Sequence, residues 1–134
     1  MYLVDTNVLS ELPRPRPNAN VVRWLQRQTS VVLSVITVEE LAYGIARAPS
    51  SQRPKLARWL DEVLDSAVQT LAVTEAIARA AGELRAARES AGRRVAQADM
   101  LIAATALIHG LTLATRNARD FVGCGIAVVD PFAP

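Results

Sequence analysis

Short runs of β-branched and apolar residues alternate along this chain with longer stretches in which apolar residues recur every three or four positions. The short runs are typical of buried strands, and the longer stretches are typical of helices that bury one face. Five strands are predicted: Tyr2–Val4, Val31–Ser34, Leu71–Val73, Leu111–Ala114 and Ile126–Val129. Strands that alternate with helices of ten or more residues predict a parallel sheet covered on both faces. The expected fold class is therefore α/β.

Capping and breaking residues delimit the helical stretches. A stiff connector is predicted at Pro13, Pro15 and Pro17, and Asn18 or Asn20 can cap the helix that follows it. Later helices are predicted from Thr37 to about Ala48, around Leu56–Leu64, over Glu75–Ser90 and over Gln97–His109. The last is apolar on most sides, which predicts a buried helix that ends at Gly110. Without a repeat or linker, the chain is expected to form a single domain, residues 1–134.

Composition narrows the class of protein. A hydrophobic fraction of 51% supports a packed core and argues against disorder. The apolar runs are too short to cross a bilayer, and the N-terminus has no basic region of the kind that begins a signal peptide. A lone cysteine, Cys124, fits a reducing compartment, so a cytoplasmic protein without membrane contact is expected. The net charge of +2 favours a polyanionic partner only weakly.

Acidic residues that are far apart in the sequence fall at one edge of the predicted sheet. Asp5 ends the first strand, Glu40 lies in the first turns of the helix after the second, Asp99 lies in the first turn of the buried helix, and Asp120 follows the fourth strand. Ligands of parallel sheets bind beyond the carboxyl ends of the strands. Clustered carboxylates suit Mg²⁺ or Mn²⁺, which can activate water and stabilise a phosphoryl group. His109 is the one histidine, so the sequence gives little support for a mechanism in which a histidine base activates a nucleophile.

Each of these acids also has an ordinary structural interpretation. Asp5 can cap the next helix, and Glu40 can form a capping box with Thr37. Asp99 can interact favourably with the dipole of the helix that it begins, and Asp120 can be a turn residue. The hypothesis of a site depends on the convergence of all four acids at one edge.

The basic and aromatic residues are ambiguous in a similar way. Arg93, Arg94 and Arg116 are candidates for contacts with nucleic-acid phosphates, although a solvated helix face is the commoner cause of such a run. The four tryptophan and tyrosine residues fall in apolar stripes, which is more typical of a core than of base stacking. They are Tyr2, Trp24, Tyr43 and Trp59.

Four ordered motifs resemble those of the PIN-domain family and are most similar to the FitB-like subgroup of VapC toxins. The first begins Met-Tyr-Leu-Val-Asp5-Thr6-Asn7, and the second is Ser34-Val-Ile-Thr37-Val-Glu-Glu40-Leu-Ala-Tyr-Gly44. The third is Ala96-Gln-Ala-Asp99-Met-Leu-Ile-Ala-Ala-Thr-Ala, and the fourth is Leu113-Ala-Thr115-Arg116-Asn117-Ala-Arg-Asp120-Phe121. The similarity runs from Met1 to about Phe132 and keeps the order and spacing of the family.

The resemblance implies a three-layer α/β/α fold, a homodimer, and an endoribonuclease toxin that uses Mg²⁺ or Mn²⁺ to cleave RNA. It also implies a VapB/FitA-like antitoxin as partner. The metal ligands implied are Asp5, Glu40 and Asp99, with Glu40 selected over Glu39 because it directly precedes Leu41. Thr6 and Thr115 are candidate hydroxyls that orient water or phosphate.

One departure from the family pattern leaves the fourth acidic position open. Asn117 is neutral where the family often has an acid, and Asp120, three residues later, is a candidate catalytic residue in its place. Two other functions therefore remain as alternatives. A PIN-like binding module would associate with an antitoxin or nucleic acid without cleavage. A phosphatase of the haloacid-dehalogenase type also begins with an Asp at a strand end, but it expects a second Asp where this chain has Asn7.

Overall fold

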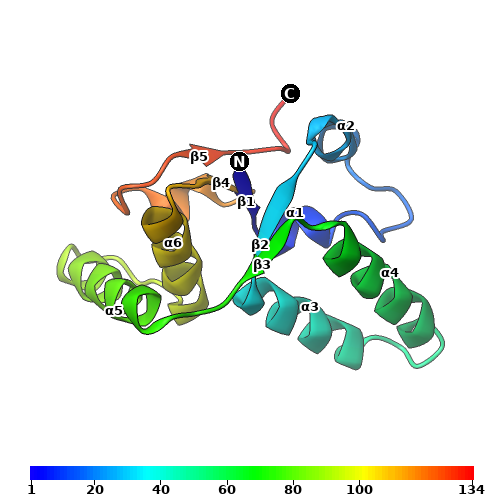
Figure 1. Ribbon diagram of the computed structural model, residues 1–134, viewed down its shortest axis with the longest axis horizontal. Coiled ribbons are helices and arrows are strands. Elements are labelled where there is room, and N and C mark those ends of the chain that lie inside the picture. Colours follow the sequence, from blue (N-terminus) through cyan, green and yellow to red (C-terminus); the bar gives the residue numbers. More distant parts are fainter.

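The computed structural model describes residues 1–134, and its centre is a five-stranded sheet (Figure 1). The strands are β1 (Tyr2–Val4), β2 (Val31–Ser34), β3 (Gln69–Leu71), β4 (Thr112–Ala114) and β5 (Val128–Val129). They lie in the order β3-β2-β1-β4-β5, and every neighbouring pair is parallel. The predicted α/β class with a parallel sheet is confirmed, and β1 lies at the centre of the sheet.

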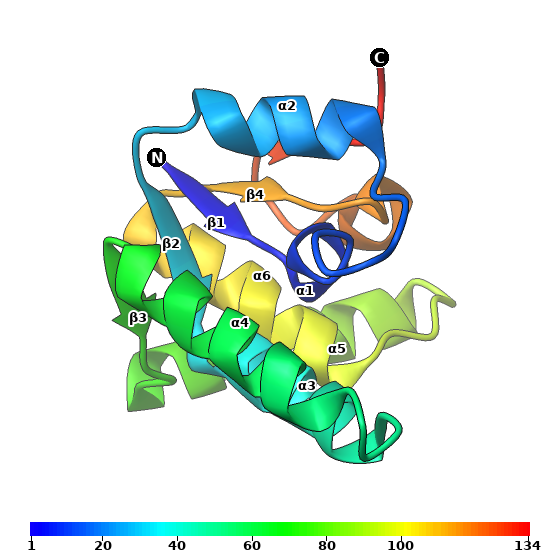
Figure 2. The same cartoon turned by 90° about the vertical axis from the view of Figure 1, so that its right-hand side faces the viewer.

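Helices cover both faces of this sheet, which gives the three layers that the resemblance implied. The helices are α1 (Thr6–Leu9), α2 (Ala19–Arg27), α3 (Val35–Arg47), α4 (Arg53–Ser66), α5 (Glu75–Ser90) and α6 (Gln97–His109), and a 3₁₀ turn spans Ala118–Phe121. Figure 1 shows α5 and α6 on one side and α1 to α4 on the other, and Figure 2 shows α2 lying across the end where β1 begins. None of these helices combines the length and the apolar character needed to span a lipid bilayer.

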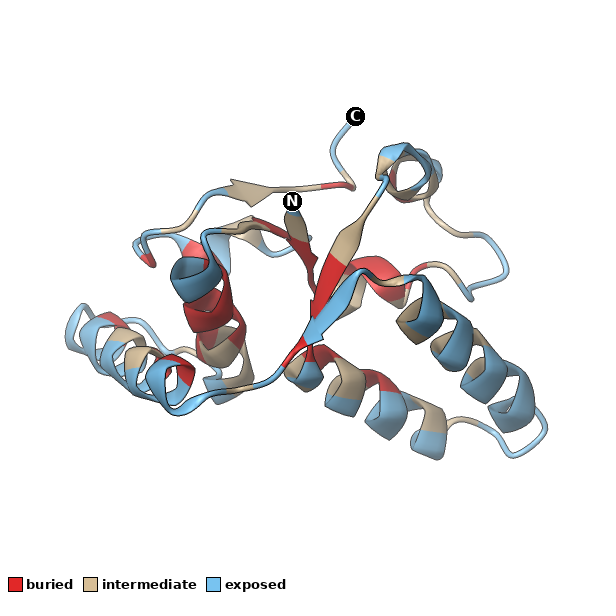
Figure 3. Cartoon of the chain, viewed as in Figure 1, coloured by how far each residue is buried: buried red, intermediate tan, exposed pale blue.

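Consecutive residues of the central strands supply the cores of the two outer layers. Leu3 and Leu113 belong to the core packed against α5 and α6, whereas Val4 and Ala114 belong to the core under α1 to α4. This follows from the geometry of a strand, in which successive side chains point to opposite faces. The middle of α6 is buried, as its apolar sequence predicted, and Figure 3 shows this beside the exposed outer faces of α4 and α5.

The edges of the sheet differ from the sequence predictions. The third strand was expected at Leu71–Val73 but pairs with β2 through Gln69, Thr70 and Leu71. Two of these three residues are exposed, so the edge strand has no hydrophobic signal in the sequence. The fifth strand is likewise shorter than expected and begins at Val128. Tyr43 was expected in the core and is 57% exposed on α3, so that prediction is wrong.

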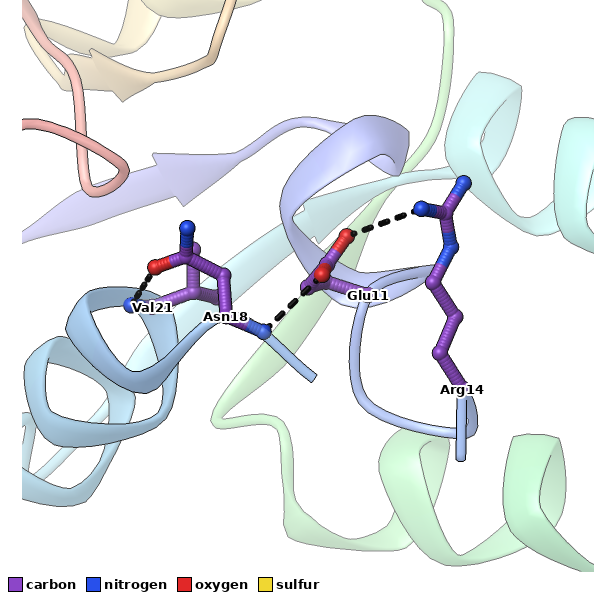
Figure 4. A network of polar contacts seen from close by, with 4 residues as sticks. All are labelled: Glu11, Arg14, Asn18 and Val21. Carbon is purple, nitrogen blue, oxygen red and sulfur yellow. Dashed lines mark hydrogen bonds and ion pairs between the residues drawn. The ribbon is translucent and has the colours of Figure 1, made fainter. Parts of the chain in front are cut away.

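The proline connector between α1 and α2 is held by a buried carboxylate. Glu11 is 7% exposed, and its Oε1 accepts a hydrogen bond of 2.9 Å from the backbone N–H of Asn18. Its Oε2 lies 3.6 Å from Nη1 of Arg14, as Figure 4 shows. Asn18 is also the N-cap of α2, because its side chain accepts from the N–H groups of Asn20 and Val21. One carboxylate therefore fixes both the connector and the start of the helix.

We expect Glu11→Ala to lower the free energy of unfolding by about 1–3 kcal/mol, because the Asn18 N–H and the Arg14 guanidinium both lose their acceptor. Urea unfolding followed by circular dichroism measures the change. Glu62→Ala, at an exposed position on α4, is the matched control and should leave the unfolding midpoint unchanged. Equal midpoints for the two variants would contradict a stabilising role for Glu11.

Candidate active site

Asp5 lies at the carboxyl end of the central strand, and its two oxygens have different partners. Oδ1 accepts a hydrogen bond of 2.8 Å from the backbone N–H of Thr6, so Asp5 caps α1 as its sequence position suggested. Oδ2 accepts from the Thr115 hydroxyl at 2.8 Å and from Nδ2 of Asn7 at 3.4 Å. Asp5 is 5% exposed, and burial raises its pKa although the hydrogen bonds from Thr115 and from the Thr6 N–H oppose the shift. A capping role and a place in a site are therefore compatible.

Asn7 links the ends of β1 and β4, a role that was not predicted from the sequence. Its Nδ2 donates to Thr115 Oγ1 at 3.2 Å, and its Oδ1 accepts from the backbone N–H of Arg116 at 3.1 Å. Thr115 Oγ1 also accepts from the N–H of Asn117 at 3.2 Å. A hydroxyl has one proton to donate and two lone pairs, so Thr115 directs its full capacity to protein groups. It orients Asp5 rather than a water or a phosphate.

Glu40 faces the same site from α3. Its Oε1 accepts a hydrogen bond of 2.7 Å from the Thr6 hydroxyl, which joins α3 to the start of α1. The capping box expected between Thr37 and Glu40 is wrong, because the N-cap of α3 is Ser34, whose hydroxyl oxygen accepts from the N–H of Ile36. Thr37 instead lies one turn into the helix with its hydroxyl buried and without a partner. With capping ruled out, Glu40 is available to the site.

The charges of the other three acids act on Asp99. Its pKa is raised from 3.8 to about 6, first by burial and then by repulsion from Asp5, Asp120 and Glu40. None of these four carboxylates forms a salt bridge with an arginine, a lysine or the histidine. The structure therefore brings together the four acids that the sequence placed at one edge of the sheet, which we call the carboxylate cluster, and leaves their charge unpaired.

A divalent cation fits the chemistry of the carboxylate cluster. Hard, anionic oxygen donors with no positive partner are the ligands that Mg²⁺ and Mn²⁺ prefer. No three His, Cys, Asp or Glu side chains converge at metal-ligand spacing in this structure, so the ligands would have to close on an ion. Asp5 is held by its hydrogen bonds, whereas Glu40 and Asp99 are half-buried and Asp120 is exposed. Closure would therefore involve the three less constrained side chains.

Two of the three candidate arginines lie beside the cluster, and the third stacks on an aromatic ring. A cleft of about 430 Å³ adjoins the cluster, and Arg93 and Arg94 line it together with Asp99 and Asp120. We call this the arginine cleft. Arg116 does not line it, because its guanidinium stacks over the ring of Phe132 at 4.8 Å. Asn117 is exposed, and its side chain forms no hydrogen bond, so only its backbone N–H takes part in the network.

Comparison with protein families gives a match that covers most of the chain. The model of the PIN domain matches residues 2–122. The chain belongs to the PIN-domain family. Among related PIN proteins, VapC ribonuclease Y4jK of Sinorhizobium fredii is 35% identical over 100% of this chain and 99% of its own. Toxin FitB of Neisseria gonorrhoeae is 37% identical over 98% of this chain and 99% of its own.

A solved PIN structure supports the same assignment. The crystal structure of FitAcB from Neisseria gonorrhoeae superposes with a TM-score of 0.93 at 37% sequence identity, and the match covers 100% of both chains. The predicted resemblance to VapC and FitB proteins is therefore confirmed over the full length of this PIN domain. The four motifs that carried the resemblance are the segments that bring the carboxylate cluster together.

We expect Asp99→Asn to stabilise this PIN domain in the presence of a chelator near neutral pH. The raised pKa means that the folded state holds the Asp99 proton more tightly than the unfolded state. Wild-type stability is therefore lost as pH rises from about 4 to about 6, and the loss is complete above that window. With allowance for partial exposure, the gain in the variant is about 1–2 kcal/mol near neutral pH, and it disappears below about pH 4.

Urea unfolding at several pH values measures this difference. Asp65→Asn, at an exposed position on α4, is the control and should give no gain at any pH. A gain for Asp99→Asn that does not change with pH would show that the buried, ionised carboxylate is not its cause.

A second pair of variants tests Asn7. Asn7→Ala removes a donor to Asp5 and Thr115 and an acceptor for Arg116 N–H, so we expect a loss of about 1–2 kcal/mol in unfolding free energy. Asn7→Asp adds a further carboxylate beside Asp5 and should lose more, with part of the loss recovered in acid. Asn117→Ala is the control, because its side chain makes no hydrogen bond. Equal stability of all three proteins would argue against the Asn7 link.

Proposed function

We propose that this PIN domain is a metal-dependent endoribonuclease toxin of a toxin–antitoxin pair. The observation that carries the proposal is the carboxylate cluster: Asp99 and the three acids that act on it come from four segments, and none of them has a basic partner. Relatives of this chain are named as a ribonuclease and as a toxin, and their similarity extends over nearly the whole length. The proposed substrate class is RNA, whose phosphodiester is the group that an acidic metal site of this kind can hydrolyse.

In this proposal Asp5, Glu40 and Asp99 hold Mg²⁺ or Mn²⁺. A bound ion of this type lowers the pKa of water and offsets charge on phosphoryl oxygens. Asp5 supplies the fixed ligand, because Thr115, Asn7 and the Thr6 N–H orient its carboxylate. Thr6 restrains Glu40 through its hydroxyl. These residues fix Asp5 before an ion or substrate binds, so the movement needed to close on an ion falls on the other acids.

We propose Asp120, rather than Asn117, for the fourth acidic position. Asp120 contributes to the repulsion that raises the pKa of Asp99 and lines the same cleft, whereas Asn117 is neutral. Arg93 and Arg94 are proposed to hold RNA phosphates in the arginine cleft, because a cation beside an acidic centre allows a polyanion to approach it. Arg116 is the weakest of the three candidates, since it stacks on Phe132.

The partners proposed are an antitoxin of the VapB/FitA type and a second copy of this chain in a homodimer. An enzyme that cuts cellular RNA has to be held inactive in the cell that makes it, and a small protein that obstructs the carboxylate cluster meets that need. Because the RNA substrate is in the cytoplasm, we propose the cytoplasm as the compartment. The proposal of a dimer rests on the family resemblance.

A binding module without cleavage is the second candidate. It is favoured by the neutral Asn117 and by the separation of the acids, no three of which meet at metal-ligand spacing. Such a module would take up Mn²⁺ weakly or not at all near Asp5. Titration with Mn²⁺, followed by electron paramagnetic resonance, therefore separates the two functions without an assay of activity.

The decisive experiment is cleavage of a mixed RNA pool by purified, antitoxin-free protein, with Mg²⁺, with Mn²⁺ and with EDTA. We expect cuts that require the metal and that fall at least about a hundredfold in Asp5→Asn, since this change removes a fixed ligand charge. Asp65→Asn is the control and should cut like the wild type. A folded protein that binds no Mn²⁺ and cuts under no condition would overturn the proposed function.

A further inference from the structure

A groove leaves the carboxylate cluster on the side of α3 and α4. Its inner part, of about 180 Å³, begins at Thr6 and Glu40 and reaches Leu56 and Trp59 on α4. Its outer part, of about 630 Å³, begins at the same Leu56 and Trp59 and opens between the proline connector and α4. The two parts adjoin at these residues and at Pro13, and we call them together the Trp59 groove.

The chemistry of the walls changes along the Trp59 groove. The inner part is almost entirely apolar, and Glu40 at the cluster end is its only carboxylate. The outer part has no acidic residue and carries two cations, Arg14 and Lys55. Lys55 is the only lysine of the chain. A groove that joins an acidic centre to an apolar middle and a basic outer end suits a ligand with flat apolar groups linked by anions.

One of the two cations is held in position. The buried carboxylate of Glu11 lies 3.6 Å from Nη1 of Arg14, as Figure 4 shows, while the Arg14 side chain remains 64% exposed. Guanidinium groups carry five N–H donors in a rigid plane, so contact at one nitrogen leaves others available for a phosphate. Glu11 therefore orients Arg14 at the outer end of the groove without enclosing it.

Gly44 supplies open space in the inner wall. It lies on α3 among the lining residues, one helical turn after Glu40, and a Cβ atom added there would meet no atom within 4 Å. A larger side chain at this position would therefore occupy the groove rather than displace the protein. Gly82 has the same open surroundings but lies on α5, which Figure 1 shows on the opposite side of the molecule from α3 and α4.

We propose that the Trp59 groove binds the nucleotides of a single-stranded RNA that adjoin the scissile phosphate. A base packs against Trp59 and Leu56, and phosphates of the same strand meet Arg14 and Lys55. This is the combination by which proteins bind single strands, since base faces stack on aromatic rings and the backbone follows cations. The inference rests on the proposed function, which places the cut at the inner end of the groove.

The arginine cleft gives the same strand a second contact. Arg93 and Arg94 adjoin Asp99 and Asp120, whereas the Trp59 groove begins at Thr6 and Glu40. The strand therefore runs along the Trp59 groove, crosses the carboxylate cluster and leaves past the arginine cleft. In this arrangement the apolar groove selects the base beside the cut, and the arginines grip the backbone whatever the sequence.

The first test uses the fluorescence of Trp59. The chain has two tryptophans, and Trp24→Phe keeps an aromatic ring against Tyr2 while leaving Trp59 as the only indole. A short single-stranded RNA of mixed sequence is titrated into this protein in EDTA at low salt. We expect quenching of Trp59, about tenfold weaker binding after Gly44→Leu, and wild-type binding after Gly82→Leu. If RNA binds without quenching Trp59, or if the two leucine variants bind RNA with equal affinity, the proposal that the groove binds RNA is wrong.

The second test maps cut sites in the RNA pool by sequencing the new ends. We expect Gly44→Leu to change the base preferred beside the cut and Gly82→Leu to keep the wild-type pattern. If the wild type quenches and binds but never cuts, the proposed function fails and the groove stands. If both variants cut alike, the groove fails and the nuclease stands. If Gly44→Leu changes neither RNA binding nor the cut sites but prevents inhibition by a co-expressed antitoxin, the groove is a protein-binding site and the proposal is wrong.

Discussion

Repulsion among four carboxylates is the interaction on which the rest of this structure depends. Burial, followed by repulsion from Asp5, Asp120 and Glu40, raises the pKa of Asp99 to about 6, and no basic side chain pairs with any of these acids. A fold that keeps such a cluster has to stabilise it elsewhere. Two separate cores, one on each face of the parallel sheet, provide that stability.

Neutral hydrogen bonds, rather than salt bridges, hold Asp5 and Glu40 in place. Thr6 donates to Glu40, Thr115 donates to Asp5, and Asn7 joins Asp5, Thr115 and the Arg116 N–H. A cation in these positions would neutralise the carboxylates and lower their affinity for a metal ion. Hydroxyl and amide groups orient the acids and leave their charge available. The network therefore accounts for the neutral residues that surround Asp5 in the chain and in the fold.

The sequence predicted those parts of the molecule that depend on periodic patterns and on strand ends. The sheet class, the buried helix α6 and the meeting of Asp5, Glu40, Asp99 and Asp120 all follow from such signals. The edge strands were misplaced because exposed residues such as Gln69 and Thr70 carry no hydrophobic signal. The role of Asn7 depends on which neighbours β4 brings to it, and a spacing pattern contains no information about that. Arg88 on α5 is buried beside Gly123, and no pattern in the sequence distinguishes it from the exposed arginines.

The arginine cleft and the Trp59 groove give the carboxylate cluster different surroundings on its two sides. This difference explains how an acidic centre can accept a polyanion. A phosphate approaching four carboxylates is repelled unless attraction elsewhere on the same strand offsets that repulsion. The arginine cleft offers charge attraction directly beside Asp99 and Asp120. The Trp59 groove offers contact with bases, which carry no charge, next to Glu40, and places its cations farther out. A single strand can use both kinds of contact at once, whereas a duplex keeps its base faces stacked and hidden, so we propose unpaired RNA as the preferred substrate.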